Sequence, residues 1–532
     1  MEDNIKKYRQ ITLLIFVGII TLLAWQSDDA YHAYIMAKNL VLGNGFVYNV
    51  GERASATSCP LFTLIIAAGY FLIRKMFVVS ILICVIFSSL AYRILTQTFC
   101  KTKKQVILAF VALVGSFCFI SYTTSGLENC LLFFLAALFL KYYYETKTYN
   151  TKQLLILAIL ISLIAMTRMD AVLMFIPMIL YVFLAKREQV SFIKAVGIGA
   201  VGLSPFILWV LFSCFYFGFP FPNTAYVKLG TSIPLKEYLY RGLQYVFTSG
   251  ITDFLLLAMP LLAVILAIVL KKARHLYMVA GIVFYGLYLI YIGGDFMVGR
   301  HFTVMFFMSI CTCMVMENED FSSYKKPQIL SKILATVIAI GFVYTATTGV
   351  ITSQFLYGNT FSSPIADERG GYFRFTGLFN NTISVLVTGD MVIQNAWNDA
   401  GVVELRDAGY SGGILKMVPG ITKYYNDDMY LNDLYALGDP FLSKLPAVRE
   451  DNWRIGHMWR EAPAGYGDTV LYGENVIENK DLAEYYEVIQ LITRGRLFDS
   501  ERIDAIIKIN SGQYDYLIEN YKDTLDENCR QK

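Results

Sequence analysis

The chain has 532 residues, of which 56% are hydrophobic and 16% charged; its formal net charge is +3 and its mean hydropathy is +0.49. Soluble globular proteins carry about 25% charged residues. This composition therefore excludes a soluble globular protein and indicates a multi-pass α-helical membrane protein. The Lys and Arg residues lie in short clusters between apolar segments, so no nucleic-acid partner is expected.

The first apolar segment covers 8–25. It continues for about 18 residues with no small-residue cleavage site, and so a retained membrane span is expected in place of a cleaved signal peptide. The segment 59–73 is also apolar, but it is only about 15 residues long and opens with Pro60. An interfacial or re-entrant helix is expected there.

A window of about 19 residues finds further apolar runs along the chain. Together with the first segment they predict about eleven membrane spans, at 8–25, 76–96, 105–121, 128–142, 153–167, 171–186, 194–215, 251–270, 275–292, 302–317 and 330–351.

Lys and Arg clusters recur in alternate loops, as expected for loops on the cytoplasmic side of a membrane. The N-terminus carries the first cluster, and the others follow at 101–104, 141–152, 186–187, 271–274 and 325–326. A full span at 59–73 would invert every later loop. We therefore expect a bacterial inner (plasma) membrane protein with a cytoplasmic N-terminus. Its extracytoplasmic loops would be 26–75, 122–127, 168–170, 216–250 and 293–301.

The adjacent carboxylates Asp28 and Asp29 follow the first span directly. Ionisable groups at a membrane mouth are costly to desolvate, and they are a functional hypothesis by default. The pair could bind a divalent cation such as Mg²⁺, Mn²⁺ or Ca²⁺, or one member could act as a general base. Alternatively, the run Ser-Asp-Asp could simply cap the N-terminus of the next helix, because Ser and Asp are favoured at N-cap positions. His32 lies one turn into an expected amphipathic helix and reads as a surface group.

The later outward loops bring further polar residues. Glu128 is either functional or a partner for a helix dipole. Lys228, close to Asn223, either binds substrate or extends to the membrane interface. Arg-Met-Asp at 168–170 favours a hairpin cap between two helices. The loop at 293–301 favours function, because its three glycines allow close backbone approach where Asp295, Arg300 and His301 converge.

The chain becomes polar and rich in Gly and Tyr from about residue 354. The expected organisation is a transmembrane module at 1–353, followed by a C-terminal α+β extracytoplasmic domain at 354–532. Strand-like runs occur at 384–387 and 469–472, and apolar spacing of three and four predicts helices at 480–494 and 499–509. Most of the nine cysteines lie in apolar stretches, which indicates small apolar side chains with neither disulfides nor a zinc site.

Outward carboxylates combined with Arg and Lys suit one chemical problem. A phosphate-linked substrate must be held at the bilayer surface while a hydroxyl attacks it. Cationic side chains would neutralise the lipid phosphate, and a carboxylate would take the proton of the incoming hydroxyl. A phosphate leaving group is a weak base and needs no general acid. This logic predicts one essential carboxylate and a cationic clamp far from it in sequence.

Several motifs carry a resemblance to a known family. The run 28–53, which begins Asp-Asp-Ala-Tyr-His, resembles the first periplasmic loop of GT-C-fold glycosyltransferases, most closely the mycobacterial terminal β-(1→2)-arabinofuranosyltransferase group. Further similar motifs follow in order: Thr-Ser-Gly-Leu-Glu at 124–128, Tyr-Phe-Gly-Phe-Pro-Phe-Pro-Asn-Thr at 216–224, Gly-Gly-Asp-Phe-Met-Val-Gly-Arg-His-Phe at 293–302, Leu-Gly-Asp-Pro at 437–440 and Trp-Arg-Ile-Gly-His at 453–457.

The resemblance implies a GT-C transmembrane module with a periplasmic domain, and a polyprenyl-phosphate sugar donor. The acceptor would be an envelope glycan or glycolipid. Carried over to this sequence, it assigns Asp28 as the base and Asp29 as its partner or as a metal ligand. Arg300 and His301 would hold the donor phosphate, with Lys228 a weaker candidate, while Glu128 and Asp295 would line the sugar site. The first loop continues Ala-Ser-Ala-Thr-Ser-Cys-Pro at 54–60, where relatives carry an acidic-aromatic run, so acceptor identity stays open.

Two other function classes were weighed against an enzyme. A transporter or flippase for lipid-linked sugars would require charges buried in the middle of spans and repeat symmetry, and the sequence shows neither. A surface binding or assembly protein whose function lies in the tail would make the carboxylates of the first loop dispensable.

Overall fold

The computed structural model describes residues 2–186, 190–229, 231, 233–324, 327–349, 364–391, 399–448 and 453–521. The chain forms two compact units. The first contains Met1–Ser27, Phe77–Phe206 and Leu235–Met391, and the second contains Asp28–Met76, Ile207–Pro234 and Val392–Lys532. Arg187, Lys325 and Lys326, which belong to the expected cytoplasmic clusters, lie outside the described residues, as does the expected start of the tail at residue 354.

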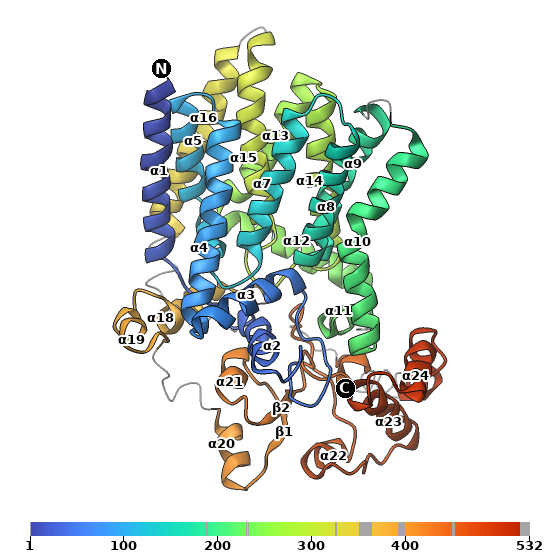
Figure 1. Ribbon diagram of the computed structural model, residues 1–532. Coiled ribbons are helices and arrows are strands. Elements are labelled where there is room, and N and C mark those ends of the chain that lie inside the picture. The colour runs from blue at the N-terminus through green and yellow to red at the C-terminus, as the bar shows by residue number, and fades with distance from the viewer. Residues whose placement is uncertain are drawn as a thin grey trace. The chain divides into compact units, whose positions relative to one another are not determined.

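The first unit consists of helices, most of which run side by side in Figure 1, while α18 and α19 lie apart from the parallel ones. In chain order they are α1 (Glu2–Leu22), α4 (Met76–Ile94), η1 (Leu95–Phe99), α5 (Lys103–Val114), α6 (Phe117–Thr123), α7 (Asn129–Glu145), α8 (Thr151–Thr167), η2 (Met169–Met174), α9 (Ile176–Tyr181), η3 (Val182–Lys186), α10 (Phe192–Phe217, shared with the second unit), α12 (Leu235–Thr252), α13 (Phe254–Leu270), α14 (Ala273–Tyr291), α15 (Phe302–Glu319), η4 (Phe321–Ser323), α16 (Pro327–Tyr344), η5 (Thr345–Gly349), α18 (Glu368–Thr376) and α19 (Thr382–Thr388).

Helix α15 forms the centre of this bundle. Every residue from Phe302 to Met316 is buried, and the helix packs against α5, α7, α13, α14 and α16. A helix that is apolar on all sides belongs in the interior of a bundle. The residues that immediately precede α15 are therefore attached to an element that has no room to shift.

Within the described ranges, four helices are long and apolar enough to cross a membrane: Met76–Phe99, Phe192–Phe217, Ala273–Tyr291 and Pro327–Thr347. The number rises to six if the bent pairs α5–α6 (82°) and α12–α13 (106°) each form one span. All eleven expected segments fall on helices, but several helices are short and 171–186 is split into η2, α9 and η3. A multi-pass membrane protein is supported, and the number eleven stays a prediction.

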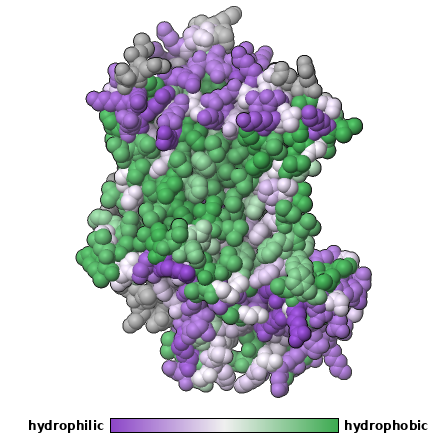
Figure 2. Space-filling model, in the orientation of Figure 1, coloured by the Kyte–Doolittle hydropathy of each residue, from purple (hydrophilic) through white to green (hydrophobic). Residues whose placement is uncertain are grey.

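Figure 2 shows hydrophobic residues gathered in a band over the helices of the first unit. Hydrophilic residues cover the end of the unit at which α1 begins. This distribution is the one expected for a bundle whose sides face lipid and whose end faces water.

The second unit combines short helices with a small sheet. Its elements are α2 (Ala30–Leu42), α3 (Pro60–Ile73), α11 (Asn223–Leu229), α20 (Ala400–Asp407), β1 (Gly412–Leu415), α21 (Gly420–Tyr425), β2 (Tyr430–Asp433), η7 (Leu442–Lys444), α22 (Tyr466–Tyr472), α23 (Lys480–Arg494) and α24 (Ser500–Asn510). Strands β1 and β2 pair in parallel, with Gly412 opposite Tyr430.

The expected helices at 480–494 and 499–509 are confirmed as α23 and α24. The expected strands at 384–387 and 469–472 are wrong, because these residues lie in α19 and α22. Both helices end at a glycine with positive φ, Gly389 (75°) and Gly473 (78°). A short apolar run cannot be assigned to strand or helix by periodicity alone, and here the left-handed caps favour helices.

The division into units differs from the boundary expected at residue 354. The segments 28–76 and 207–234 belong with the C-terminal part of the chain, and the first unit extends to Met391. Hydrogen bonds between distant segments explain the grouping within the second unit. Arg53 N donates to Thr493 O (3.0 Å), Arg460 Nη2 to Val227 O (2.9 Å) and Arg502 Nη2 to Phe215 O (2.7 Å).

These bonds also bear on membrane topology. Segments that bond to one another must lie on one side of a membrane, so the chain crosses it an even number of times between them. The expected spans number six between 76 and 215 and four between 251 and 351. A further span at 59–73 would make the first number odd. The bonds thus support the expected interfacial assignment of that segment, which forms the short helix α3.

We expect the connection at 101–104 to be cytoplasmic, because it carries Lys residues and follows two expected spans, 8–25 and 76–96, counted from a cytoplasmic N-terminus. A cysteine at position 103 should then react with a membrane-permeant maleimide in intact cells but not with an impermeant one. A cysteine at Glu474, in the expected outer domain, serves as the control and should react with both. Impermeant labelling at 103 would contradict the topology.

Candidate active site

Within the first unit, the expected loop at 293–301 joins α14 to α15 and holds a left-handed backbone at its glycines. A Cβ on Gly294 (φ 76°) would lie 2.5 Å from Tyr245 Cβ, and one on Gly299 (φ 69°) would lie 2.5 Å from Cys118 Sγ. The glycines therefore allow close approach, as expected, but what they approach is the surrounding helices. The loop is packed firmly and carries Asp295, Arg300 and His301 at fixed positions.

Glu128, at the N-cap position of α7, makes no cap hydrogen bond with its side chain. Its buried carboxylate instead accepts two hydrogen bonds from Arg300 Nη2, at 3.0 and 3.1 Å. Arg168 Nη1 donates a third, at 2.8 Å. Two guanidinium groups thus share one carboxylate, which is a stronger role than that of a helix-dipole partner.

Arg168 caps the hairpin as expected, because its backbone N donates to Ile164 O at the end of α8 (2.7 Å), but its side chain has a further role. Its Nε lies 2.9 Å from Asp170 Oδ1, and its Nη2 lies 3.1 Å from His301 Nε2. Tyr285 OH bonds to both Asp170 (3.1 Å) and His301 Nδ1 (3.0 Å). Arg168 therefore joins the turn after α8 to α7 and to the loop before α15.

Burial and the positive charge of Arg168 lower the pKa of His301, so this histidine is neutral at pH 7. Burial acts to raise the pKa of Asp170, but the charge of Arg168 and the hydrogen bonds from Tyr285 and Arg168 are among the effects that together lower it. Asp295 Oδ2 lies 3.1 Å from His301 Nε2 and 3.9 Å from Arg300 Nη1. We call this group of charged side chains the ion cluster. With His301 neutral, it contains two cations, Arg168 and Arg300, and three carboxylates, Glu128, Asp170 and Asp295.

The structure therefore brings together four of the expected residues, Glu128, Asp295, Arg300 and His301. It adds three that the sequence analysis did not assign to the site: Arg168, Asp170 and Tyr285. The only sequence signal for Arg168 and Asp170 was the shortness of their turn. Because Glu128 already neutralises Arg300, the ion cluster offers no surplus of positive charge.

Within the second unit, Asp28 is bound to the start of helix α21. Its Oδ2 accepts a hydrogen bond from Gly420 N and its Oδ1 one from Ile421 N, each at 2.9 Å. A Cβ on Gly420 would lie 2.6 Å from Asp28 O, so glycine is required for this approach. Burial raises the pKa of Asp28, and the two backbone amides oppose that shift. Asp28 does cap a helix, but the helix lies in a distant part of the sequence.

Asp29 differs from its neighbour. It occupies the N-cap position of α2 without a cap hydrogen bond, and its carboxylate makes no hydrogen bond or ion pair with any described residue. Its charge acts on the half-buried His457, whose pKa burial lowers to about 4 against the influence of Asp29. A carboxylate that is partly exposed and unpaired is the more available proton acceptor.

Further polar groups of the second unit surround the pair. Burial raises the pKa of Asp433 to about 6, and the charge of His32 acts on this carboxyl group. The His32 ring lies 5.5 Å from that of Tyr48, so His32 is partly buried and is not a plain surface group. A Cβ on Gly456, next to His457, would lie 3.2 Å from Lys228 Cε. No local sequence pattern pointed to Asp433, and His457 was expected only as part of the motif at 453–457.

Asn223 holds the backbone of this unit together. Its N donates to Ser55 O (2.9 Å) and its Nδ2 donates to Leu437 O (3.3 Å). Among the described residues, no group of three or more His, Cys, Asp or Glu side chains could hold a metal ion. Both oxygens of Asp28 already accept backbone N–H groups, which leaves Asp29 as the carboxylate of the pair open to a cation.

A third carboxylate of the second unit, Asp439, gives a pH-dependent prediction. It accepts hydrogen bonds from Phe441 N, Leu442 N and Tyr466 OH. Burial, reinforced by the charge of Glu52, raises its pKa from 3.8 to about 7. Between about pH 4 and 7 the folded chain keeps a proton that the unfolded chain has released, so Asp439 lowers stability as pH rises through this window.

In Asp439→Asn, the thermal midpoint of the purified protein should therefore fall less from pH 5 to pH 7 than in the unmodified protein. Asp504→Asn, which removes an exposed carboxylate, is the control and should leave the slope unchanged. An unchanged slope in Asp439→Asn would assign the pH dependence to other groups.

Comparison with known families adds a separate line of evidence. Residues 57–211 match the model of the dolichyl-phosphate-mannose-protein mannosyltransferase family. The match supports a membrane glycosyltransferase of the GT-C type. It includes Glu128, Arg168 and Asp170, but it begins after Asp29 and ends before Asp295. No curated protein and no solved structure matches the chain.

Proposed function

We propose that the protein transfers a sugar, a pentofuranose in the first instance, from a polyprenyl-phosphate donor to an envelope glycan or glycolipid on the outer face of a bacterial inner membrane. The observation that carries the proposal is the match of residues 57–211 to a family whose members use a lipid-phosphate sugar. Two sets of side chains also support the proposal. The carboxylate pair after the first span could supply a base, and the buried ion cluster could bind the donor.

In the proposed reaction, the acceptor hydroxyl oxygen forms a bond to the anomeric carbon of the sugar. The bond from that carbon to the phosphate oxygen breaks, and polyprenyl phosphate leaves with the electron pair. The hydroxyl proton passes to a carboxylate. The sequence alone indicated Asp28 as this base, but its oxygens are held by two amides of α21. We therefore assign the base to Asp29 and the positioning of Asp29 to Asp28.

The roles expected for the first unit remain part of the proposal. Arg300 and His301 contact the donor phosphate, and Glu128 and Asp295 line the sugar site. Both bonds from Arg300 to Glu128 come from Nη2. A guanidinium has five N–H donors, so Glu128 and a phosphate oxygen can share Arg300. Lys228 is the further candidate, and a divalent cation at Asp29 is compatible with the proposal, although no step depends on it.

The proposal is tested by incubating the purified protein with radiolabelled polyprenyl-phosphate pentose and hexose, each with a soluble acceptor glycan. We expect labelled product and release of polyprenyl phosphate. Movement of the intact donor across a vesicle membrane without product would identify a flippase. No turnover and no movement would leave binding as the function and contradict an enzyme.

Arg300→Lys should weaken donor binding by about 1–3 kcal/mol, because a lysine keeps the charge but loses the planar fork. Donor affinity would be measured by titration with a non-transferable polyprenyl-phosphate analogue. Arg93→Lys, a change at an exposed position on α4, is the control and should have no effect. Unchanged donor affinity in Arg300→Ala would remove this residue from the donor site.

A further inference from the structure

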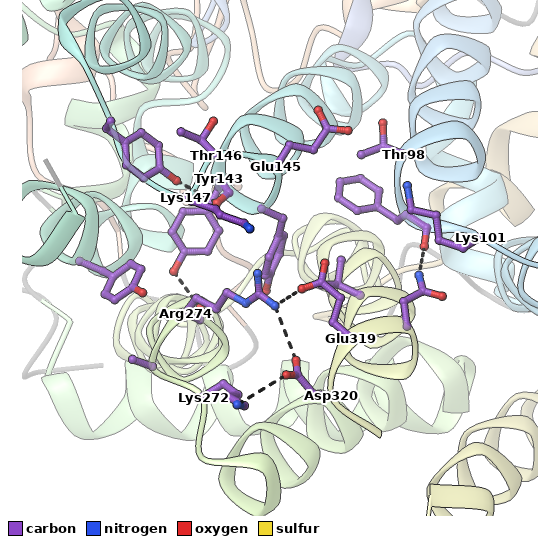
Figure 3. A pocket seen from close by; sticks show the side chains of 17 residues that line it. Thr98, Lys101, Tyr143, Glu145, Thr146, Lys147, Lys272, Arg274, Glu319 and Asp320 are labelled. Atoms are coloured by element: carbon purple, nitrogen blue, oxygen red, sulfur yellow. Dashed lines mark hydrogen bonds and ion pairs between the residues drawn. The ribbon is translucent and has the colours of Figure 1, made fainter. Parts of the chain in front are cut away.

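A cavity of about 590 Å³ opens at one end of the first unit, away from the ion cluster. It lies where the C-terminal ends of α7 and α15 meet the start of α14 and the connection after η1 (Figure 3). Its charged lining residues are Lys101, Glu145, Lys147, Lys272, Arg274, Glu319 and Asp320.

The cavity and the ion cluster are separated by the length of helix α7. Glu128 immediately precedes this helix, and Glu145, which lines the cavity, is its last residue. A helix of 17 residues at 1.5 Å per residue is about 25 Å long. The cavity is therefore a separate site on the opposite end of the unit.

The walls of the cavity are held by hydrogen bonds that do not require a ligand. Tyr143 OH donates to Arg274 O (2.8 Å), which ties the end of α7 to the start of α14. Tyr149 OH donates to Tyr143 O (2.8 Å). The Arg274 guanidinium also lies over the Tyr144 ring, 5.6 Å from its centre. The cavity is thus pre-formed, which lowers the entropic cost of binding.

Two of the three carboxylates of the wall, Glu319 and Asp320, are neutralised by cations of the wall, whereas Glu145 makes no ion pair with any described residue. Arg274 pairs with Glu319, and Figure 3 shows the guanidinium directed at Glu319 and Asp320. The carboxylate of the buried Asp320 has two further partners. Its Oδ2 lies 2.6 Å from His275 Nε2, and its Oδ1 lies 4.0 Å from Lys272 Nζ. Lys101 and Lys147, in contrast, make no ion pair with any described residue. Two ammonium groups and the Glu145 carboxylate therefore remain without an ion pair among the described residues, so the unpaired charge of the wall is positive by one.

We propose that this cavity binds a phosphate group, carried either by a membrane lipid headgroup or by a soluble phosphate compound. Its volume lies in the range of about 300–1,000 Å³ typical of small-molecule sites. Basic pockets between membrane helices on the cytoplasmic side accept lipid headgroups. Arg9 Nη2 donates to Cys100 O (2.7 Å), which brings the basic start of α1 to this end of the unit.

The experiment titrates the delipidated full-length protein with three probes: phosphatidylglycerol, the phosphate-free lipid diacylglycerol, and inorganic phosphate. Lipid adducts are counted by native mass spectrometry, and inorganic phosphate is followed by thermal shift. Lys101→Ala/Lys147→Ala should weaken phosphatidylglycerol binding about tenfold or more, since each surface lysine contributes about 1 kcal/mol. The matched control Lys103→Ala/Lys152→Ala removes the same charge outside the cavity and should bind normally. Thr146→Trp, which fills the cavity and keeps every charge, should abolish binding.

Phosphatidylglycerol binding that only the cavity variants lose identifies a lipid headgroup site. Stabilisation by inorganic phosphate with the same sensitivity identifies a soluble phosphate site. The proposal is overturned if neither probe binds, if diacylglycerol binds equally well, or if the control variant loses as much affinity as the cavity variant. Transfer activity is not part of the readout, so failure here leaves the proposed function intact.

Discussion

Asp29→Asn should lower the rate of sugar transfer about a hundredfold or more, with little change in stability. A positioned general base contributes about 10²–10⁴-fold, and an asparagine of the same size cannot accept the proton. The carboxylate of Asp29 makes no hydrogen bond or ion pair with any described residue, so the fold loses no contact when it is replaced. Initial rates at saturating donor, together with the thermal midpoint, measure both effects.

Asp28→Asn separates the two carboxylates. Gly420 N and Ile421 N each donate to a different oxygen of Asp28, and in asparagine an NH2 group replaces one of these oxygens, so one of the two N–H groups would face another donor. We expect a loss of about 1–3 kcal/mol in the free energy of unfolding and an indirect loss of activity. Normal turnover in Asp29→Asn, with a stable but inactive Asp28→Asn, would return the role of base to Asp28. Full activity in both variants would refute the proposed mechanism.

Arg168→Met should lower the free energy of unfolding by about 3–5 kcal/mol, because it leaves buried carboxylates without their cation. Glu128 would keep only Arg300, and Asp170 would lose its ion pair at 2.9 Å. Arg168→Lys should cost less, since a single ammonium can still reach one carboxylate. The measurement is equilibrium unfolding in mixed micelles.

The control for Arg168 is Arg406→Met. Arg406 also forms an ion pair at 2.8 Å, with Asp428, but the two side chains are 44% and 60% exposed. Exposed pairs contribute about 0–1 kcal/mol, so this variant should hardly change stability. Equal effects of the two substitutions would mean that the ion cluster contributes no more to stability than a surface pair does.

The sequence predicted those features of the structure best that depend only on residues close together in the chain, such as apolar length and spacing. Apolar length placed every expected span on a helix, and the composition correctly indicated a membrane protein. Spacing of three and four in the final 50 or so residues predicted α23 and α24. The runs at 384–387 and 469–472 were misassigned because a run of four residues, three of them apolar, fits a strand and a helix turn equally well.

The candidate site was predictable only in part, for the same physical reason. Loop polarity pointed to Glu128, Asp295, Arg300 and His301, and the structure joins them. The role of Arg168 depends on partners 40 and 133 residues away, which no local pattern contains. Likewise, adjacent Asp28 and Asp29 look alike in the sequence. The two amides that distinguish them lie about 390 residues further along the chain.

That separation has a consequence for biosynthesis. Ribosomes add about 5–20 residues per second, so roughly 20–80 seconds pass between the synthesis of Asp28 and that of Ile421. During this time all the later helices of the bundle must be made and inserted, while the first loop has no partner for its capping carboxylate. The loop reaches its final conformation only near the end of synthesis. Chains that stop before α21 would therefore contain the whole helical bundle of the first unit and still lack an ordered carboxylate pair.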